Sequence, residues 1–79
     1  MDEIDLRIKK IMSTIFEIDI NKINDNSSFD LIENWDSMNH MNLIVALEEE
    51  FNIQFSDDNI ENLLNFKLIK FIIKELIDQ

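Results

Sequence analysis

Isoleucine recurs along the start of the chain at alternating steps of four and three residues, at Ile4, Ile8, Ile11, Ile15 and Ile18. Because an α-helix completes a turn in about 3.6 residues, this spacing gathers the side chains into one apolar stripe. Acidic residues open the segment and basic residues follow them, an order that suits the helix dipole. The pattern predicts a first helix over residues 2–16, and its stripe must be buried against other elements.

Residues 17–36 lose this period and are rich in Asn, Asp and Ser. Residues of these types favour turns, so the segment is expected to be a loop, although a loop of such length is uncommon in a small domain. Apolar residues scattered through it indicate that it is held to the core, with a short turn of helix expected near Phe29–Ile32.

Three more helices are predicted after this loop. The second helix is expected over Ser37–Phe51, with Asp36 as its N-cap. Ser56 is expected to cap a short third helix that reaches about Leu63, and Asn65 to cap a last helix dense in apolar residues. The buried face predicted for the second helix consists of Leu43, Ile44, Leu47 and Phe51.

Gly and Pro are both absent, so no strong helix breaker interrupts these segments. The nearest approach to a strand pattern, residues 52–55, is too short to need a partner strand. The sequence therefore predicts an all-α fold, a small bundle of three long helices and one short one, with a long loop between the first two. With 79 residues, it is expected to form a single domain over residues 1–79.

The net charge of −10 restricts the classes of partner. Nucleic acids and anionic membrane surfaces bind through Lys and Arg, so both are unfavourable partners. Proteins with basic surfaces are favoured as partners, and the alternative is that the acidity serves solubility alone. Without cysteine the chain has no disulfide and no thiol of its own. No apolar segment approaches a membrane span and the N-terminus is acidic, so a cytoplasmic location is expected.

The sequence Asp36-Ser37-Met38 opens the predicted second helix with a hydroxyl beside a carboxylate. The positive end of a helix favours a phosphate at such a position. Serine is common at helix starts, so the three residues alone carry little information. Their surroundings make the pattern more specific.

The segment from about Phe29 to Ile73 resembles the acyl carrier protein family. The resemblance includes Asp36-Ser37-Met38, the stretch Ala46-Leu47-Glu48-Glu49-Glu50-Phe51, the Asp57-Asp58 start of the third helix and the Asn65-Phe66 start of the fourth. It implies that Ser37 carries a covalent 4'-phosphopantetheine arm, attached by a phosphopantetheinyl transferase to which Asp36 helps present the serine. It also implies a non-catalytic monomer that delivers acyl thioesters between acyl-activating and acyl-transferring enzymes.

The same resemblance implies a surface that partner enzymes contact. Met38, Met41 and Val45 would form its apolar patch, Glu48 and Glu49 would meet basic residues, and Trp35 would either anchor a partner or cover the loop. Ser37, Met41, Val45 and Glu48 also fall roughly on one line of the helix. The alternative for Met38 and Met41 is that they only fill the core. A cargo pocket is expected near Ile44, Leu47 and Ile60.

Some positions depart from the family pattern. Asn34 and Trp35 stand before Asp36, where many members have a glycine, and Asn39, His40 and Asn42 stand where carriers of fatty-acid synthesis usually have acids. The departures favour a carrier of a specialised pathway, whereas the resemblance itself favours a fatty-acid-related role. His40 is expected to be a polar surface residue. A Ser37–His40 catalytic pair is not expected, because no orienting partner accompanies it.

Other functions are less well supported by the residues. Asp57, Asp58 and Glu61 could hold a cation weakly, but a solvated helix start explains them equally, and no metal site is expected. An aminoacyl or D-alanyl-type carrier would share Asp36-Ser37-Met38. An acidic helical interaction module would use the same face with no modification of the serine.

Overall fold

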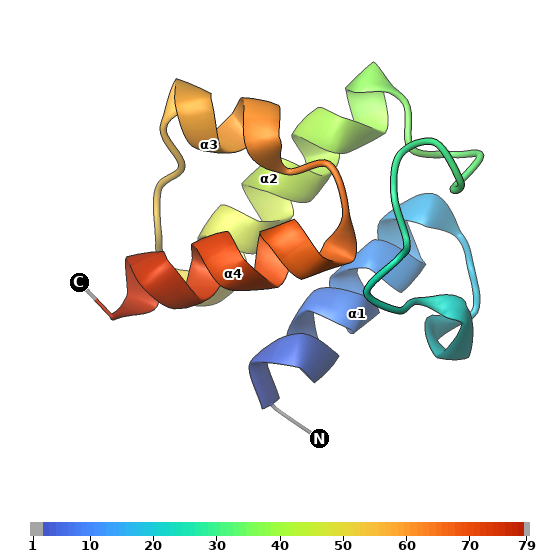
Figure 1. The fold of residues 1–79 in the computed structure, drawn as a ribbon, viewed down its shortest axis with the longest axis horizontal. Helices are drawn as coiled ribbons and strands as arrows, with labels where there is room; N and C mark the ends of the chain where they lie inside the picture. Colours follow the sequence, from blue (N-terminus) through green and yellow to red (C-terminus); the bar gives the residue numbers. More distant parts are fainter. Residues whose placement is uncertain (1–2, 79) are drawn as a thin grey trace.

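The computed structural model describes residues 3–78 and is all-helical. The elements are α1 (Glu3–Phe16), the 3₁₀ helix η1 (Ile20–Lys22), α2 (Ser37–Phe51), the short α3 (Asp57–Asn62) and α4 (Phe66–Ile77). Within residues 3–78 there is no strand, only an isolated bridge between Ser28 and Asn65. The predicted bundle is confirmed, and α4 crosses in front of α2 with α3 above it (Figure 1). Asp2, the predicted first residue of α1, lies outside the described residues.

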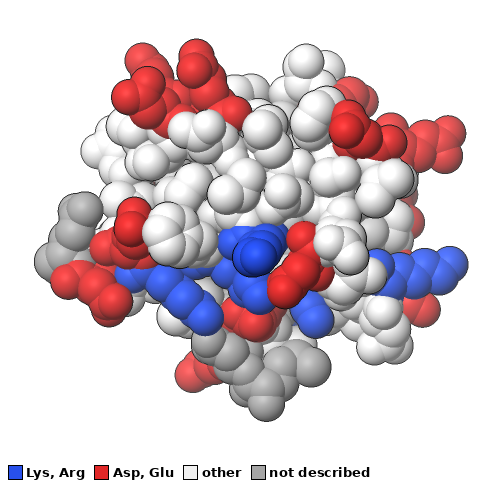
Figure 2. Space-filling model, in the orientation of Figure 1, with Lys and Arg blue, Asp and Glu red and all other residues white. Residues whose placement is uncertain are grey.

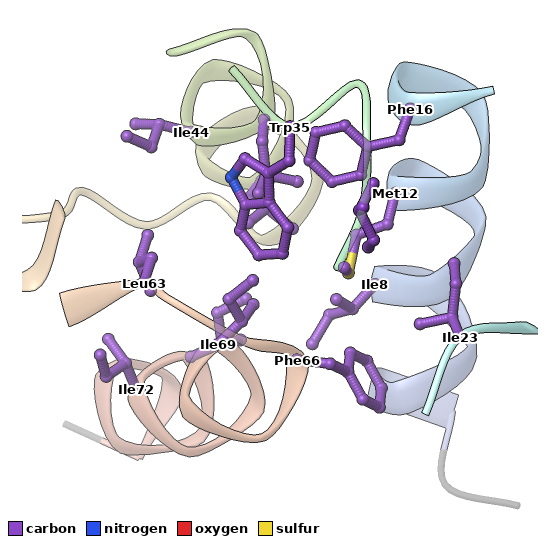
Figure 3. Close-up of a cluster of buried hydrophobic side chains, with 14 of the residues drawn as sticks. Ile8, Met12, Phe16, Ile23, Trp35, Ile44, Leu63, Phe66, Ile69 and Ile72 are labelled. Atoms are coloured by element: carbon purple, nitrogen blue, oxygen red, sulfur yellow. The ribbon is translucent and has the colours of Figure 1, made fainter. Parts of the chain in front are cut away.

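The core lies between α1, α2 and α4. The fully buried face of α1 consists of Ile8, Met12 and Phe16, while the other isoleucines of the stripe are partly buried around it. α2 buries Leu43, Ile44 and Leu47 as predicted, whereas Phe51 is half-buried under the Arg7 guanidinium at 4.4 Å. Figure 3 shows the Trp35 ring between side chains of α1 on one side and Leu63 and Ile69 on the other.

Polar side chains begin three helices, as the sequence predicts. The Asp36 carboxylate accepts a hydrogen bond from the Asn39 N–H at 2.8 Å and so caps α2. Ser56 begins α3 through a capping box, in which its hydroxyl and the Asn59 amide satisfy each other's backbone N–H groups. Asn65 caps α4 by accepting from the Leu68 N–H at 2.8 Å. These caps fix where each helix starts.

The long crossover from α1 to α2 is held by backbone hydrogen bonds to the start of α4 and to the segment between α3 and α4. The Phe66 N–H donates to the Ser27 carbonyl at 2.9 Å, and the Phe29 N–H donates to the Leu64 carbonyl at 3.2 Å. The expected turn near Phe29–Ile32 is a hydrogen-bonded turn closed onto the Ser28 carbonyl, not a helix. These hydrogen bonds therefore fix the position of the residues that precede α2.

The 3₁₀ helix η1 was not predicted, although Asp19 caps it by accepting from the Asn21 N–H. Among the helices of residues 3–78, none is long and apolar enough to cross a membrane.

Candidate functional site

Ser37 is the first residue of α2, and its side chain is exposed. The first N–H groups of a helix have no partners within the helix, so they and the helix dipole favour an anion there. No residue among 3–78 makes a hydrogen bond with the Ser37 hydroxyl. Other serines are engaged: Ser13 donates to Ile18, Ser27 accepts from Asn24 and Ser56 accepts from Asn59. Ser37 is therefore the serine whose hydroxyl is presented outward at the start of a long helix.

A chain of asparagine side chains holds the backbone around Ser37. The Asn34 amide donates to the Phe16 carbonyl at 2.8 Å and so attaches the crossover to the end of α1. The Asn39 amide donates to the Asn34 carbonyl at 2.8 Å, and the Asn42 amide donates to Asn39 at 3.1 Å. An amide both donates and accepts hydrogen bonds, whereas an ionised acid, the usual family residue at positions 39 and 42, can only accept them. The asparagines therefore position the start of α2.

Trp35 belongs to the core. Its ring is only 6% exposed and stacks on Phe16 with the ring centres 4.9 Å apart. The interpretation of Trp35 as a partner anchor is corrected, because a ring packed in this way offers little surface to another protein. The alternative, that Trp35 covers the loop, agrees with the structure.

His40 links three parts of the molecule, and the prediction of a plain surface residue is wrong. The Trp35 Nε1 donates to His40 Nδ1 at 2.9 Å, and His40 Nε2 lies 3.1 Å from the Ile60 carbonyl oxygen in α3. An indole N–H can only donate, so Nδ1 must be the acceptor. The proton of the neutral ring is therefore on Nε2, which donates to Ile60. Because both ring nitrogens are engaged, the ring is not available as a base for Ser37.

A pocket of about 350 Å³ opens beside Ser37. Its lining comes from the crossover, the start of α2 and the segment between α3 and α4, and consists of Phe29, Trp35, Asp36, Ser37, His40, Met41, Leu63 and Leu64. Ile44, Leu47 and Ile60 do not line this pocket: Ile44 and Leu47 are packed into the core, and the Ile60 backbone bonds His40. The pocket lies at the N-terminal end of α2, and the cargo pocket expected near those three residues stays a prediction.

Exposed apolar side chains line the pocket and the adjoining face of α2. Met38, Met41 and Val45 are 76%, 51% and 50% exposed, so they form a surface patch as predicted and do not fill the core. Sequence reasoning missed Phe29 and Leu64, which are 48% and 41% exposed and line the same pocket. Both lie in loops, where periodicity gives no signal of which side chains face outward. We refer to these five residues as the apolar patch.

The two acids expected at a partner surface have different surroundings. Glu49 is exposed, whereas the Glu48 carboxylate is half-buried and accepts a hydrogen bond from the Phe55 N–H at 2.9 Å. The Glu48 carboxylate therefore also holds the α2–α3 connection, and contact of Glu48 or Glu49 with a partner stays a prediction. Its neighbour Glu50 is bound by Arg7 at 2.7 Å.

The basic residues are confined to part of the chain. All seven Lys and Arg residues lie outside residues 23–66, the range that contains α2 and α3. Figure 2 shows basic side chains in a band over α4 and α1 with acidic groups among them, whereas the upper edge of the view, including the part over α3, carries acidic groups without basic ones. The part of the chain around Ser37 is therefore free of Lys and Arg. Among residues 3–78, no three His, Cys, Asp or Glu side chains form a group that could hold a metal ion.

Comparison with known proteins defines the class to which this fold and site belong. Residues 6–66 match the family model described as "Phosphopantetheine attachment site", a domain that carries 4'-phosphopantetheine covalently on a serine. The acyl carrier protein of Buchnera aphidicola subsp. Schizaphis graminum (strain Sg) is 43% identical over 63 residues, which cover 80% of each chain. The acyl carrier protein of Buchnera aphidicola subsp. Baizongia pistaciae (strain Bp) is 38% identical over 77 residues, covering 98% of this chain and 99% of that one. The chain belongs to the acyl carrier protein family, whose members are carriers and not catalysts.

Proposed function

We propose that Ser37 is the serine that receives 4'-phosphopantetheine and that the chain delivers acyl groups between biosynthetic enzymes from this position. The observation that carries the proposal is the outward, unbonded Ser37 hydroxyl at the start of α2, within the matched residues 6–66. A phosphopantetheinyl transferase would join the Ser37 oxygen to the phosphorus of coenzyme A that bears the pantetheine. The pyrophosphate bond breaks in that step, the adenosine bisphosphate leaves, and the serine proton passes to a base.

The residues around Ser37 fit such a group. The N-terminal N–H groups of α2 favour the negative charge of a phosphodiester. Asp36 fixes the backbone that presents the serine, and the pocket beside it offers apolar walls. When bound, the group supplies the thiol that the chain lacks and on which an acyl group is carried as a thioester.

The apolar patch and Glu49 are the surface that we propose for partner enzymes. Methionine side chains repack readily, which suits a protein that must be contacted by several enzymes in turn. Residues 23–66 contain no Lys or Arg. Their acidic side chains would therefore attract the basic surface of a transferase or an acyl-handling enzyme, and no basic side chain in this range would repel it. We expect the chain to act as a monomer in these contacts.

The relatives are named as acyl carrier proteins, which favours a fatty-acid-related or specialised acyl pathway over an aminoacyl carrier. Loading tests separate these classes. A fatty-acyl ligase and an amino-acid-activating ligase would each be offered the phosphopantetheinylated protein, and the intact mass would show which group is added. We expect fatty-acyl addition. Addition of an amino acid alone would favour the D-alanyl-type alternative.

The proposal is tested by intact-protein mass after incubation with coenzyme A, magnesium and a broad-specificity phosphopantetheinyl transferase. The wild type should gain the mass of one phosphopantetheine, and Ser37→Ala should gain none. Ser28→Ala is the matched control, because Ser28 lies in the same region but is not at a helix start, and it should be modified like the wild type. A folded wild type that several transferases leave unmodified would refute the proposal and favour the unmodified interaction module.

A further inference from the structure

The pocket beside Ser37 has an open rim and a buried floor. The rim consists of Phe29, Asp36, Ser37, Met41 and Leu64, which are all exposed. The floor consists of Trp35, which is 6% exposed, of Leu63, which is fully buried, and of the half-buried His40. An apolar group that enters past the rim therefore meets Trp35 and His40 before it could reach the core.

Two hydrogen bonds and one ring stack close this floor. Trp35 Nε1 donates to His40 Nδ1 at 2.9 Å, and His40 Nε2 bonds the Ile60 carbonyl at 3.1 Å, so the floor joins the crossover to α2 and α3. The far face of Trp35 stacks on Phe16, which is itself fully buried. Figure 3 shows the Trp35 ring beside Phe16, so a movement of the indole toward α1 would have to displace Phe16.

Opening the floor would separate Trp35 from His40. The indole N–H would then be left without its acceptor in a buried position, which is unfavourable because a buried donor that loses its partner is not rehydrated. Trp35 belongs to the same buried cluster as Leu43, Leu47 and Ile69, which are fully buried. The volume of about 350 Å³ is near the lower end of the range for ligand pockets, roughly 300–1,000 Å³.

We infer that Trp35 and His40 act as a specificity-determining floor, which restricts the pocket beside Ser37 to short acyl groups and leaves long acyl chains exposed to solvent. The inference rests on the proposed function of Ser37. In this proposal the two residues act by setting the depth to which cargo can be shielded, and they take no part in the transfer of the arm or in the thioester chemistry.

The test compares cargo of increasing length on the intact protein. A transferase offered butanoyl-, octanoyl- or hexadecanoyl-coenzyme A loads each acyl group together with its arm, and the intact mass reports the loading. Cleavage of each thioester by hydroxylamine is then timed against the same free thioester. In the wild type we expect strong protection of butanoyl, less of octanoyl and none of hexadecanoyl.

Two variants open the floor in different ways. Trp35→Phe keeps an aromatic ring against Phe16 but removes the N–H donor, and His40→Ala removes the acceptor and the link to α3. Both should extend protection to hexadecanoyl, by about tenfold in cleavage rate. Thr14→Ala, on the exposed side of α1, is the control and should keep the wild-type profile. Circular dichroism establishes whether each variant is folded. If His40→Ala does not fold, Trp35→Phe alone decides the test.

A second readout follows the floor directly. Trp35 is the only tryptophan, so its indole N–H gives one NMR resonance, which should stay protected from solvent exchange in the butanoyl form.

The inference is overturned if both folded variants keep the wild-type length profile, or if the wild type already shields hexadecanoyl. Titration of free butanoyl- and hexadecanoyl-pantetheine into Ser37→Ala, followed by Trp35 emission, tests the floor without modification. A response to the short thioester alone supports the floor even where loading fails, and an equal response to both refutes it.

Discussion

Glu48 and Glu49 are neighbours in the sequence and have the same charge, yet the structure gives them different surroundings. Glu49 is exposed on α2, while the Glu48 carboxylate receives the Phe55 N–H at 2.9 Å across the α2–α3 connection. Sequence spacing places both on the outer side of the helix and cannot distinguish them. The difference arises from the path of the chain after Asn52, where the backbone turns back toward α2.

Substitution of these two acids should therefore have different effects on stability. Glu48→Ala removes the acceptor of a half-buried N–H and should lower the free energy of unfolding by about 1–2 kcal/mol. Glu49→Ala should change it by less than about 0.5 kcal/mol, as is usual for exposed positions. Urea denaturation followed by circular dichroism measures both. Equal losses in the two variants would mean that the Glu48 hydrogen bond contributes nothing.

The Asp36 side chain both caps α2 and carries a negative charge, and a substitution can separate these two roles. Asn caps a helix about as well as Asp, so Asp36→Asn should keep the free energy of unfolding within about 0.5 kcal/mol of the wild type. The same change removes the carboxylate that we propose helps to present Ser37 to the transferase, so modification should be several-fold slower. Thermal melting and the time course of intact mass measure the two effects. Modification of Asp36→Asn at the wild-type rate would show that only the cap matters.

The helices illustrate what local sequence can predict at the scale of an element. The caps Asp36, Ser56 and Asn65 each bind a backbone N–H three residues away, so the sequence contains both partners and their spacing. The C-terminal ends are less evident, because helices commonly end on glycine and this chain has none. Glu17 and Asn52 take the left-handed conformation instead, with φ of 56° and 54°.

Glu17 is the more strained of these two ends, because asparagine tolerates the left-handed region better than glutamate does. Replacing Glu17 by Gly removes the steric conflict of its Cβ and should raise the free energy of unfolding by about 1 kcal/mol. The matched control is Glu49→Gly, within helical α2, which should lower it by about the same amount. Thermal melting distinguishes the two signs. A loss of stability in Glu17→Gly would show that the end of α1 is not strained.

The features that sequence reasoning missed depend on partners far along the chain. Trp35, His40 and Ile60 form one connection although Ile60 is 20 residues from His40, and the acceptor on Ile60 is a backbone carbonyl that any residue would supply. The pocket lining likewise depends on the return of Leu63 and Leu64 toward Ser37. The helices, and the place of Ser37 at the start of α2, could be anticipated from local patterns. The floor and depth of the pocket arise only from tertiary packing.

For the whole molecule, the position of the crossover depends on a cluster of charges with α4. Lys70 Nζ lies 2.7 Å from Asp25 in the crossover and 3.6 Å from Asp5 in α1, so one side chain connects three segments. The hydrogen bond from Lys70 holds the pKa of Asp25 below its ordinary value of 3.8, and the same bond raises the pKa of Lys70 above 10.5. These shifts mean that the ionised pair favours the folded state.

The signs of the two shifts define the pH range in which the pair stabilises the fold. The contribution of Asp25 is complete above its ordinary value of 3.8 and is lost as the pH falls through its lowered pKa. The contribution of Lys70 is complete below 10.5 and is lost as the pH rises through its raised pKa. Asp25→Asn should therefore be slightly less stable than the wild type at neutral pH, and the two should converge in strong acid.

The size of this difference should be modest and sensitive to salt, because Asp25 is exposed and exposed ion pairs are screened. Asp30→Asn is the matched control, since Asp30 is also an exposed acid of the crossover but does not contact Lys70. Melting temperatures of both variants, measured from strong acid to neutral pH at low and high salt, test the prediction. A deficit in Asp25→Asn that is the same at every pH would assign the effect to something other than the ion pair. The deficit we expect would show that the crossover that delivers Ser37 to the start of α2 is held partly by charge.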